Sequence, residues 1–280
     1  MHENDPLHLD DLISKALQED LGLGDITTRA IVPSGHQASG DFVAKEELVL
    51  AGWMIVERTF QHLSDYITST CFFKEGDLVP SGSLLARVAG PATVLLSGER
   101  VALNFLQHLC GVATLTRKFV QAVSGSKAVI LDTRKTTPGF RAAEKYAVRV
   151  GGGRNHRLGL ADGVLIKENH ITAAGGVGEA VRRARAGVDH LKKIEVEVTT
   201  LEELNQALHA GADAILLDNM TVEAIRKAVH QVEKKVPLEV SGGVTLDNIR
   251  AFAATGVDYI SVGALTHSAK ASDISFELKL

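Results

Sequence analysis

The chain has 280 residues, 45% of them hydrophobic, which is enough to bury a sizeable core in one large domain or two smaller ones. A net charge of -4 gives no general attraction to nucleic acid, and the longest apolar stretch, residues 48–56, is too short to cross a bilayer. Two cysteines offer neither a disulfide framework nor paired metal ligands, and the polar residues 1–11 do not resemble a secretory signal. We therefore expect a cytoplasmic protein that binds neither nucleic acid nor membranes.

The first predicted element is an amphipathic helix over residues 9–21, because apolar residues such as Leu9, Ile13 and Leu17 recur at helical spacing. Residues 40–98 hold short apolar runs, the last at residues 92–96, separated by Gly, Pro and Ser. This pattern predicts a small, mostly antiparallel sheet. A long helix is predicted to follow over residues 99–123.

From about residue 125, strand-like and helix-like segments alternate. Strands are predicted at residues 128–133, 163–167, 192–198, 214–218, 237–241 and 259–263, with helices at 177–186, 201–210, 221–230 and 246–255. The alternation predicts βαβ units around a parallel sheet, which is either an open doubly wound sheet or a barrel. In both architectures ligands bind at the carboxyl ends of the strands.

Cations gather at the first two of these strand ends. Residues 132–170 hold eight Lys or Arg against four Asp or Glu, although the whole chain is acidic. Arg134 and Lys135 stand at a strand end before a turn-forming sequence, so we expect both to face a ligand. We interpret Lys145 and Arg149 as a solvated helix face.

His156 and Arg157 follow the glycine run 151–153, where the backbone can approach a ligand closely. A His before an Arg is by itself more often structural than functional. Together with Lys167, these two residues would complete a pocket for a dicarboxylate and a phosphate.

Carboxylates follow at the middle strands. Glu195 and Glu197 are two residues apart on one strand, so both face the same side. We expect Glu197 to contact the ligand and Glu195 to pair with an inner lysine such as Lys167. Glu197 and Asp218 suit Mg2+, which takes one or two carboxylates; the alternative is that they bind only ribose hydroxyls.

Glycine turns end the last two predicted strands. Ser241, Gly242 and Gly243 precede a helix predicted to start within residues 245–248, and Gly263 lies one βα unit later. Backbone N–H groups at such turns, together with a helix N-terminus, predict a phosphate cup.

These residues fall in blocks that resemble the quinolinate phosphoribosyltransferase family. Residues 132–139, DTRKTTPG, are similar to the family's signature, and residues 19–28 resemble its amino-terminal EDLGxGDITT element. Further similar blocks, in the family's order, cover residues 151–157, 167–170, 194–198, 217–219, 239–243 and 261–266. One difference is Glu168, where Asp is usual.

The resemblance implies an α/β fold: an amino-terminal α/β sandwich domain, here residues 1–110, and an open, incomplete α/β barrel of parallel strands, residues 111–280. The last residues are candidates to return to the first domain. The resemblance also implies a homodimer with shared active sites, in which Arg100 reaches the partner's site; assembly beyond the dimer stays open.

The implied activity is decarboxylating transfer of a phosphoribosyl group from phosphoribosyl pyrophosphate to quinolinate, with Mg2+, giving nicotinate mononucleotide, pyrophosphate and CO2 in NAD synthesis. By resemblance, the pyridine carboxylates are expected to meet Arg134, Lys135, His156, Arg157 and Lys167. The ribose and metal are expected at Glu197 and Asp218, and the 5'-phosphate at Ser241, Gly242 and Gly263. The expected catalytic residues are Lys135, Glu197 and Asp218.

Three alternatives stay open. A sibling protein associated with molybdate-transport genes has a similar sequence but another substrate. Nicotinate phosphoribosyltransferase acts on a monocarboxylate, which needs fewer cations than this chain supplies. A non-catalytic metabolite-binding or scaffold protein would be expected to lack some of the charges found at the strand ends.

Overall fold

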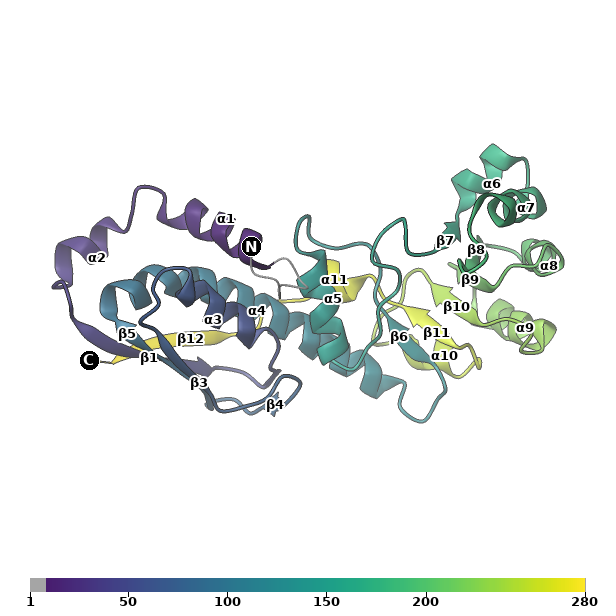
Figure 1. The fold of residues 1–280 in the computed structure, drawn as a ribbon. Helices are drawn as coiled ribbons and strands as arrows, with labels where there is room; N and C mark the ends of the chain where they lie inside the picture. The colour runs from purple at the N-terminus through teal and green to yellow at the C-terminus, as the bar shows by residue number, and fades with distance from the viewer. Residues whose placement is uncertain (1–8, 280) are drawn as a thin grey trace. The chain divides into compact units, whose positions relative to one another are not determined.

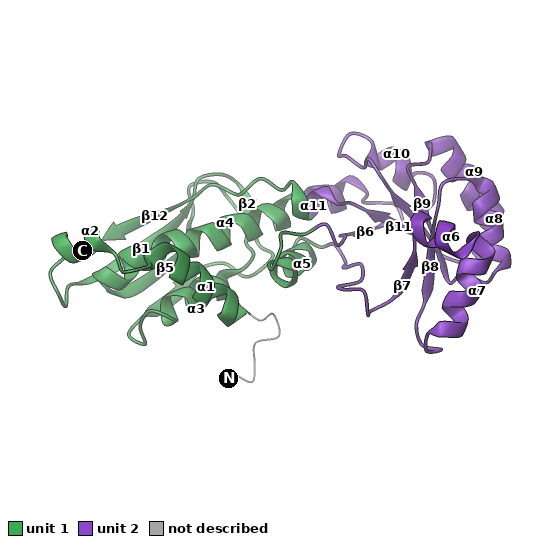
Figure 2. Ribbon diagram, turned by 90° about the horizontal axis from the view of Figure 1, so that it is seen from above, with its two compact units in different colours: residues 1–117, 136–152, 266–280 green, residues 118–135, 153–265 purple. Residues whose placement is uncertain are grey.

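The computed structural model describes residues 9–279, so most of the polar segment 1–11, which was predicted not to be a secretory signal, lies outside the described residues. The chain groups into two compact units, and each is described by itself (Figure 2). Unit 1 contains residues 1–117, 136–152 and 266–280, and unit 2 contains residues 118–135 and 153–265. Within residues 9–279, every helix is too short or too polar to span a bilayer.

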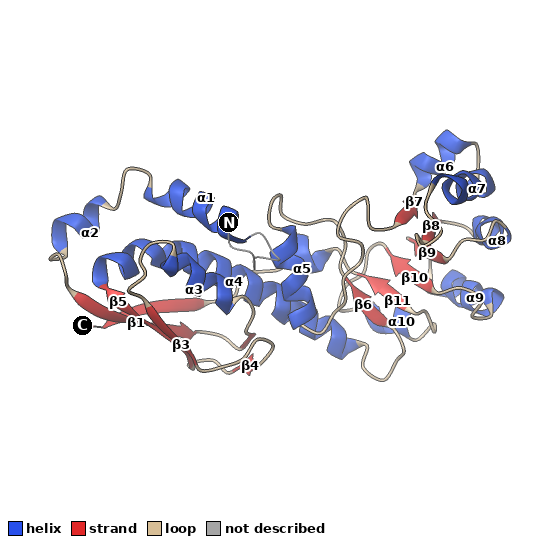
Figure 3. Cartoon of the chain, viewed as in Figure 1, coloured by secondary structure: helices blue, strands red, loops and turns tan. Residues whose placement is uncertain are grey.

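Unit 1 is built on a four-stranded antiparallel sheet with the order β12-β1-β5-β3 (Figure 3). Its strands are β1 (Gln37–Ala44), β3 (Thr68–Cys71), β5 (Leu84–Pro91) and β12 (Ile274–Lys279), and a separate ribbon joins β2 (Leu48–Val49) to β4 (Leu78–Val79). The last strand of the chain, β12, lies beside β1 (Figure 1). Their register sets Phe42 opposite Phe276. The small, mostly antiparallel sheet predicted from the sequence is confirmed.

The helices of unit 1 are α1 (Leu9–Leu21), α2 (Ile26–Ile31), α3 (Trp53–Gln61), α5 (Arg141–Val150) and most of α4 (Ala92–Ala122). The predicted helix 9–21 is confirmed to the residue. The long helix, however, begins seven residues before the predicted start, and the expected strand at residues 92–96 is wrong. The buried residues Ala92, Leu95 and Ala102 continue the helical spacing of α4 back to its first turn, so packing outweighs the local strand preference of this run.

The core of unit 1 centres on Phe42 of β1, which is fully buried. Its ring meets that of Trp53 in α3 at 5.5 Å and that of Phe276 in β12 at 5.1 Å, both edge to face. Such pairs add roughly 0.5–1.5 kcal/mol to the gain from burial. Aromatic packing therefore holds α3 and the C-terminal strand against β1.

Helix α5 buries a wider face than an amphipathic pattern predicts. Glu144 and Lys145 are both buried, so the interpretation of Lys145 as part of a solvated face is wrong, whereas Arg149 is exposed. Glu144 accepts hydrogen bonds from His108 Nε2 at 2.8 Å and from the Thr137 N–H at 3.0 Å. These contacts anchor the turn that follows the basic strand end.

Asp41 ties three strands of this sheet together. Its buried carboxylate accepts hydrogen bonds from Arg87 Nη2 at 2.8 Å and from Lys279 Nζ at 2.5 Å, and the bond with Arg87 above all lowers the pKa of Asp41 to about 2. A carboxyl whose pKa is lowered by folding stabilises the protein above its ordinary pKa of 3.8, and this contribution is lost as the pH falls toward 2.

We expect Asp41→Asn to lower the free energy of unfolding by roughly 1–2 kcal/mol at pH 7. This range allows for the partial screening of both ion pairs by solvent, because the side chains of Arg87 and Lys279 are partly exposed. Urea titrations should show this difference shrinking as the pH approaches 2. Glu277→Gln is the control, because the Lys45–Glu277 pair of the same sheet is exposed and should contribute little. An Asp41→Asn effect independent of pH would contradict the prediction.

Unit 2 is built on a six-stranded parallel sheet with the order β6-β11-β10-β9-β8-β7. Its strands are β6 (Val129–Leu131), β7 (Val164–Ile166), β8 (Ile194–Val198), β9 (Ala214–Asp218), β10 (Leu238–Ser241) and β11 (Tyr259–Ser261). Strands β6 and β7 stand at opposite ends of this order and do not pair with each other. The barrel that the curved sheet forms is therefore open between β6 and β7 (Figure 2). The predicted open, incomplete α/β barrel of parallel strands is confirmed.

Alternation along each strand separates two faces of this sheet. In β8, Ile194, Val196 and Val198 are buried, while Glu195 and Glu197 point to the other, inner face. The helices of unit 2 are α6 (Glu168–Ala174), α7 (Val177–Gly187), α8 (Leu201–His209), α9 (Val222–Val232) and α10 (Ile249–Ala253), and the short α11 (Ala264–His267) is divided between the two units. Polar side chains on the inner face are thus available for a ligand.

Helix α10 begins at Ile249, so the predicted start within residues 245–248 is wrong. Asn248 Oδ1 accepts the Thr245 N–H at 2.8 Å, and Asn248 Nδ2 donates to the Gly243 carbonyl at 2.8 Å. These side-chain bonds satisfy backbone groups in a turn, which competes with helix formation. The expected helix contribution to the phosphate cup is correspondingly weaker.

Candidate active site

One edge of the parallel sheet carries five of the predicted residues. Glu197 lies in β8, Asp218 ends β9 and Ser241 ends β10, while Lys167 follows β7 directly and Gly263 comes two residues after β11. Ser241 and Asp218 are direct partners in the ladder between β9 and β10. Because the strands are parallel, their carboxyl ends meet at a single edge, where ligands bind in folds of this kind.

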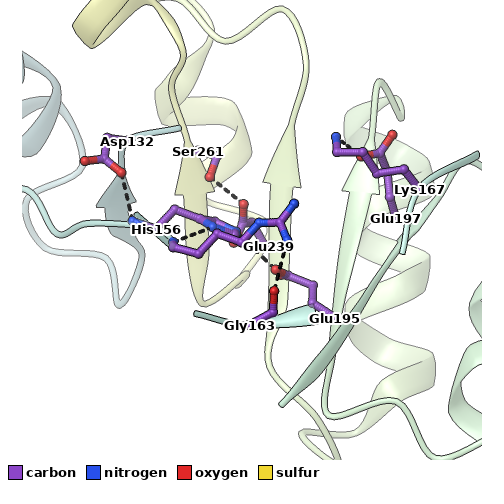
Figure 4. A network of polar contacts seen from close by, with 9 residues as sticks. Asp132, His156, Gly163, Lys167, Glu195, Glu197, Glu239 and Ser261 are labelled. Carbon is purple, nitrogen blue, oxygen red and sulfur yellow. Dashed lines mark hydrogen bonds and ion pairs between the residues drawn. The ribbon is translucent and has the colours of Figure 1, made fainter. Parts of the chain in front are cut away.

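Lys167 and Glu197 form an ion pair at this edge, with 2.7 Å between Lys167 Nζ and Glu197 Oε2 (Figure 4). The prediction that Lys167 pairs with Glu195 is therefore wrong. The register explains why: Ile166 is opposite Val196, so the residue after β7 stands beside Glu197. The pair places a cation and a carboxylate side by side at the carboxyl edge of the sheet.

Asn219, the residue after β9, contacts both Asp218 and Ser241. Asn219 Nδ2 donates to Asp218 Oδ2 at 2.7 Å, and the Asn219 N–H donates to the Ser241 carbonyl at 2.9 Å. Gly242 has a φ of +96°, and a Cβ at this position would lie 2.2 Å from Asn219 Oδ1. The close approach of the two strand ends therefore requires glycine at residue 242.

We expect Gly242→Ala to destabilise the protein by more than the roughly 1–2 kcal/mol that a left-handed backbone conformation costs a residue with a Cβ. Gly211→Ala is the matched control, because Gly211 also has a positive φ of +79° but its Cβ would meet open space. Urea unfolding of both variants gives the comparison. Equal losses of unfolding free energy in the two variants would mean that the Asn219 side chain can move away from the added Cβ at little cost.

Two cations lie close together on the basic side of the sheet. Burial, and next the positive charge of Arg134, lower the pKa of the Arg157 guanidinium, and Arg157 Nη1 donates to the Gly163 carbonyl at 2.9 Å. Lys135 is exposed, and its N–H donates to Thr133 Oγ1 at 3.0 Å in a turn. Like charges held together favour a bound anion, and a carboxylate suits two guanidinium groups.

His156 lies among the inner side chains of the sheet (Figure 4). Its Nε2 is 3.1 Å from Glu195 Oε2 and 3.7 Å from Glu239 Oε2. Its backbone N–H donates to the buried Asp132 at 2.8 Å. Figure 4 shows these residues apart from Lys167 and Glu197, so the cations predicted to line one pocket form two groups.

Sequence reasoning missed Glu239, whose side chain is 4% exposed. It accepts a hydrogen bond from Ser261 Oγ, and burial, more than the charge of Glu195, raises the pKa of Glu239 to about 8. A signal was present, because the period of two in β10 sets Glu239 on the same face as Ser241. Asp132, fully buried, was likewise missed as an anchor for His156.

The two predicted metal ligands suit a hard cation. Glu197 is opposite Leu216 in the register, and Asp218 lies two residues further along β9, so both carboxylates face the inner side of adjacent strands. Two carboxylates leave room for the water and phosphate oxygens that Mg2+ prefers. Arg100 belongs to α4 in unit 1 and is exposed.

Comparison with known proteins gives the family. The family described as quinolinate phosphoribosyl transferase, C-terminal domain, matches residues 112–277, and the corresponding N-terminal domain matches residues 25–110. The chain belongs to the quinolinate phosphoribosyl transferase family. The two matches together cover residues 25–110 and 112–277, which is nearly the whole sequence.

Relatives support the family assignment over full length. The probable nicotinate-nucleotide pyrophosphorylase [carboxylating] of Bacillus subtilis is 46% identical and covers 98% of this chain and 94% of its own. The Mycobacterium leprae protein named nicotinate-nucleotide pyrophosphorylase [carboxylating] is 46% identical over 96% of both chains. The crystal structure of NadC from Streptococcus pyogenes superposes with a TM-score of 0.95, at 42% identity, over 100% of this chain and 99% of that one. The quinolinate phosphoribosyl transferase fold is thus shared throughout.

Proposed function

We propose that this chain transfers the phosphoribosyl group of phosphoribosyl pyrophosphate to quinolinate, releasing pyrophosphate and CO2 to form nicotinate mononucleotide in de novo NAD synthesis. The observation that carries the proposal is the inner edge of the parallel sheet, where a cationic side meets the carboxylates Glu197 and Asp218. The names of the full-length relatives agree with this reaction. Membership of the family and the charges of the site point to the same chemistry.

In this proposal the cations bind the pyridine dicarboxylate. Arg134 and Arg157, which are close enough to influence each other electrostatically, offer two guanidinium forks for the two carboxylates. Lys135 and Lys167 complete the cationic side, and the His156 ring lies beside Arg157. Held in this way, the ring nitrogen faces the ribose carbon, and positioning supplies a large part of the rate.

Glu197 and Asp218 serve the ribose and the metal. As the bond from C1 of the ribose to pyrophosphate breaks, positive charge develops on the sugar, and the two carboxylates stabilise it. Mg2+, when bound, would neutralise the leaving pyrophosphate. The Ser241, Gly242 and Gly263 turns offer backbone N–H groups to the 5'-phosphate.

Decarboxylation follows from the first bond. Once the ring nitrogen is joined to C1 of the ribose, the ring is cationic and accepts the electron pair left when CO2 departs from C2. That carbon then takes one proton, so no general base is required. The cations Arg134 and Arg157 therefore act by binding and orientation.

We further propose a cytoplasmic homodimer in which the exposed Arg100 of each subunit completes the partner's site. Gel filtration with light scattering tests the assembly. A mixture of an Arg100→Ala subunit with a subunit inactive at Glu197 should regain about a quarter to a half of the wild-type turnover, because one complete site then forms per mixed dimer. Lack of any recovery would contradict the shared site.

The reaction is tested by incubating the protein with quinolinate, phosphoribosyl pyrophosphate and Mg2+ and measuring CO2 release. We expect CO2 and nicotinate mononucleotide in equal amounts, and no product when nicotinate replaces quinolinate. Turnover of nicotinate instead would favour a monocarboxylate enzyme. Absence of turnover with both acids would favour the molybdate-linked sibling or a non-catalytic binding protein.

A further inference from the structure

A group of polar side chains lies inside unit 2, near the amino ends of the parallel strands. A cavity of about 250 Å3 opens at the amino ends of the parallel strands, and it is lined by His156, Arg157, Glu195 and Glu239 among others. Glu195 and Glu239 project from β8 and β10 onto the inner face of the sheet (Figure 4). Neither glutamate has a part in the proposed reaction.

The hydrogen bonds of His156 define its protonation state. Nδ1 accepts the N–H of Arg157 at 2.8 Å, so this nitrogen carries no proton. The proton is therefore on Nε2, which donates to Glu195 Oε2 at 3.1 Å. Both ring nitrogens are thus used within the protein.

The same bonds argue against a metal at this position, although His156, Glu195 and Glu239 place ligand atoms within 4.8 Å of one another. A metal on Nε2 would move the ring proton to Nδ1. That proton would then face the N–H of Arg157, donor against donor, at 2.8 Å. The trio is better suited to holding the ring than to holding a cation.

The two glutamates form one unit around the ring. Glu239 accepts a hydrogen bond from Ser261, and its carboxyl group lies 3.7 Å from the same His156 nitrogen that Glu195 meets at 3.1 Å; two carboxyl groups so close together favour a proton on one of them. Glu239 is the more buried of the two, so it is the one that keeps the proton. Glu195 Oε2 is the oxygen that meets His156 Nε2, at 3.1 Å.

We propose that Glu195 and Glu239 are positioning residues of the quinolinate site: they fix the His156 ring, and through its hydrogen bond to the Arg157 amide they fix where the Arg157 guanidinium lies. Asp132 holds the same segment from the other side, because it accepts the N–H of His156 at 2.8 Å. The inference rests on the proposed function, since Arg157 matters only if it binds a carboxylate of the substrate.

Glu195→Ala tests the first link. It leaves the Nε2–H of His156 without its acceptor, and we expect KM for quinolinate to rise about tenfold, while KM for phosphoribosyl pyrophosphate changes less than about twofold. Glu75→Gln is the control for general destabilisation. Glu75 is a carboxyl of unit 1 that accepts the Gly52 and Trp53 N–H groups, and it has no part in the proposed machinery.

Glu239→Gln tests the proton on Glu239. It also gives a second, independent test of the positioning role if Glu195→Ala does not fold. Glutamine retains a donor toward Glu195 and an acceptor for Ser261, so KM for quinolinate should stay within about twofold of wild type at pH 7. Above pH 8, where Glu239 loses its proton, the wild-type KM should rise and the variant's should not. The charged or titratable groups that share the cavity with Glu239 are His156, Arg157, Lys193, Glu195, Asp213 and Tyr259.

These measurements distinguish failure of the positioning role from failure of the proposed function. Unchanged quinolinate KM in Glu195→Ala, or the same alkaline rise in Glu239→Gln as in wild type, would overturn the positioning role. A rise in KM for both substrates that Glu75→Gln also shows would reduce the role to general stability, which likewise overturns it. Failure of the wild-type protein to turn over quinolinate would instead reject the proposed function.

Discussion

Arg134→Ala is expected to raise KM for quinolinate by two orders of magnitude or more, equivalent to about 3 kcal/mol of lost binding. Arg134 lies three residues after the end of β6, and its positive charge contributes to lowering the pKa of Arg157. Its removal leaves one substrate carboxylate desolvated without a partner. Steady-state kinetics with each substrate, together with calorimetric binding of quinolinate, measure the loss.

Two variants sharpen the Arg134 result. Arg134→Lys keeps the positive charge but loses the two parallel N–H donors of the guanidinium. Its KM for quinolinate should therefore lie between those of the wild type and Arg134→Ala. Arg182→Ala removes an exposed arginine of α7, which pairs with Glu179, and should leave both KM values unchanged. Wild-type affinity and turnover in Arg134→Ala would show that the cationic side of the sheet is not the quinolinate site.

Glu197→Ala is expected to lower kcat by roughly 10²–10³-fold, the range typical for loss of a group that stabilises transition-state charge. The carboxylate faces the inner side of β8 and is 17% exposed, paired with Lys167 at 2.7 Å. Without it, developing charge on the ribose loses a partner and Lys167 loses its counterion. Steady-state kinetics over a range of Mg2+ concentrations provide the measurement.

The Mg2+ series also distinguishes the two roles left open for Glu197. If the carboxylate holds the metal, kcat of the variant should partly recover at high Mg2+; if it binds only ribose hydroxyls, the loss should be independent of Mg2+. Glu179→Ala, which removes a helix-surface carboxylate of the same unit, should behave as wild type. Kinetics of Glu197→Ala identical to wild type at all concentrations would reject both roles.

Where sequence predictions failed, packing or a side-chain hydrogen bond outweighed the local backbone preference. Residues 92–96 have the composition of a strand, yet Ala92 and Leu95 pack as the first turn of α4. Residues 245–248 have a helix-start pattern, but the Asn248 side chain holds a turn instead. Lys145 looked like a surface residue and is buried in α5.

The sequence alone was sufficient to predict the parallel α/β architecture and the set of residues at the carboxyl edge, because hydrophobic periodicity and strand ends are local properties of the chain. The tertiary structure decided which charges meet: Lys167 with Glu197, and His156 with Glu195 and the buried Glu239. Those pairings depend on the register between strands far apart in the chain and on depth within the sheet. Neither quantity is encoded in the spacing of residues along one strand.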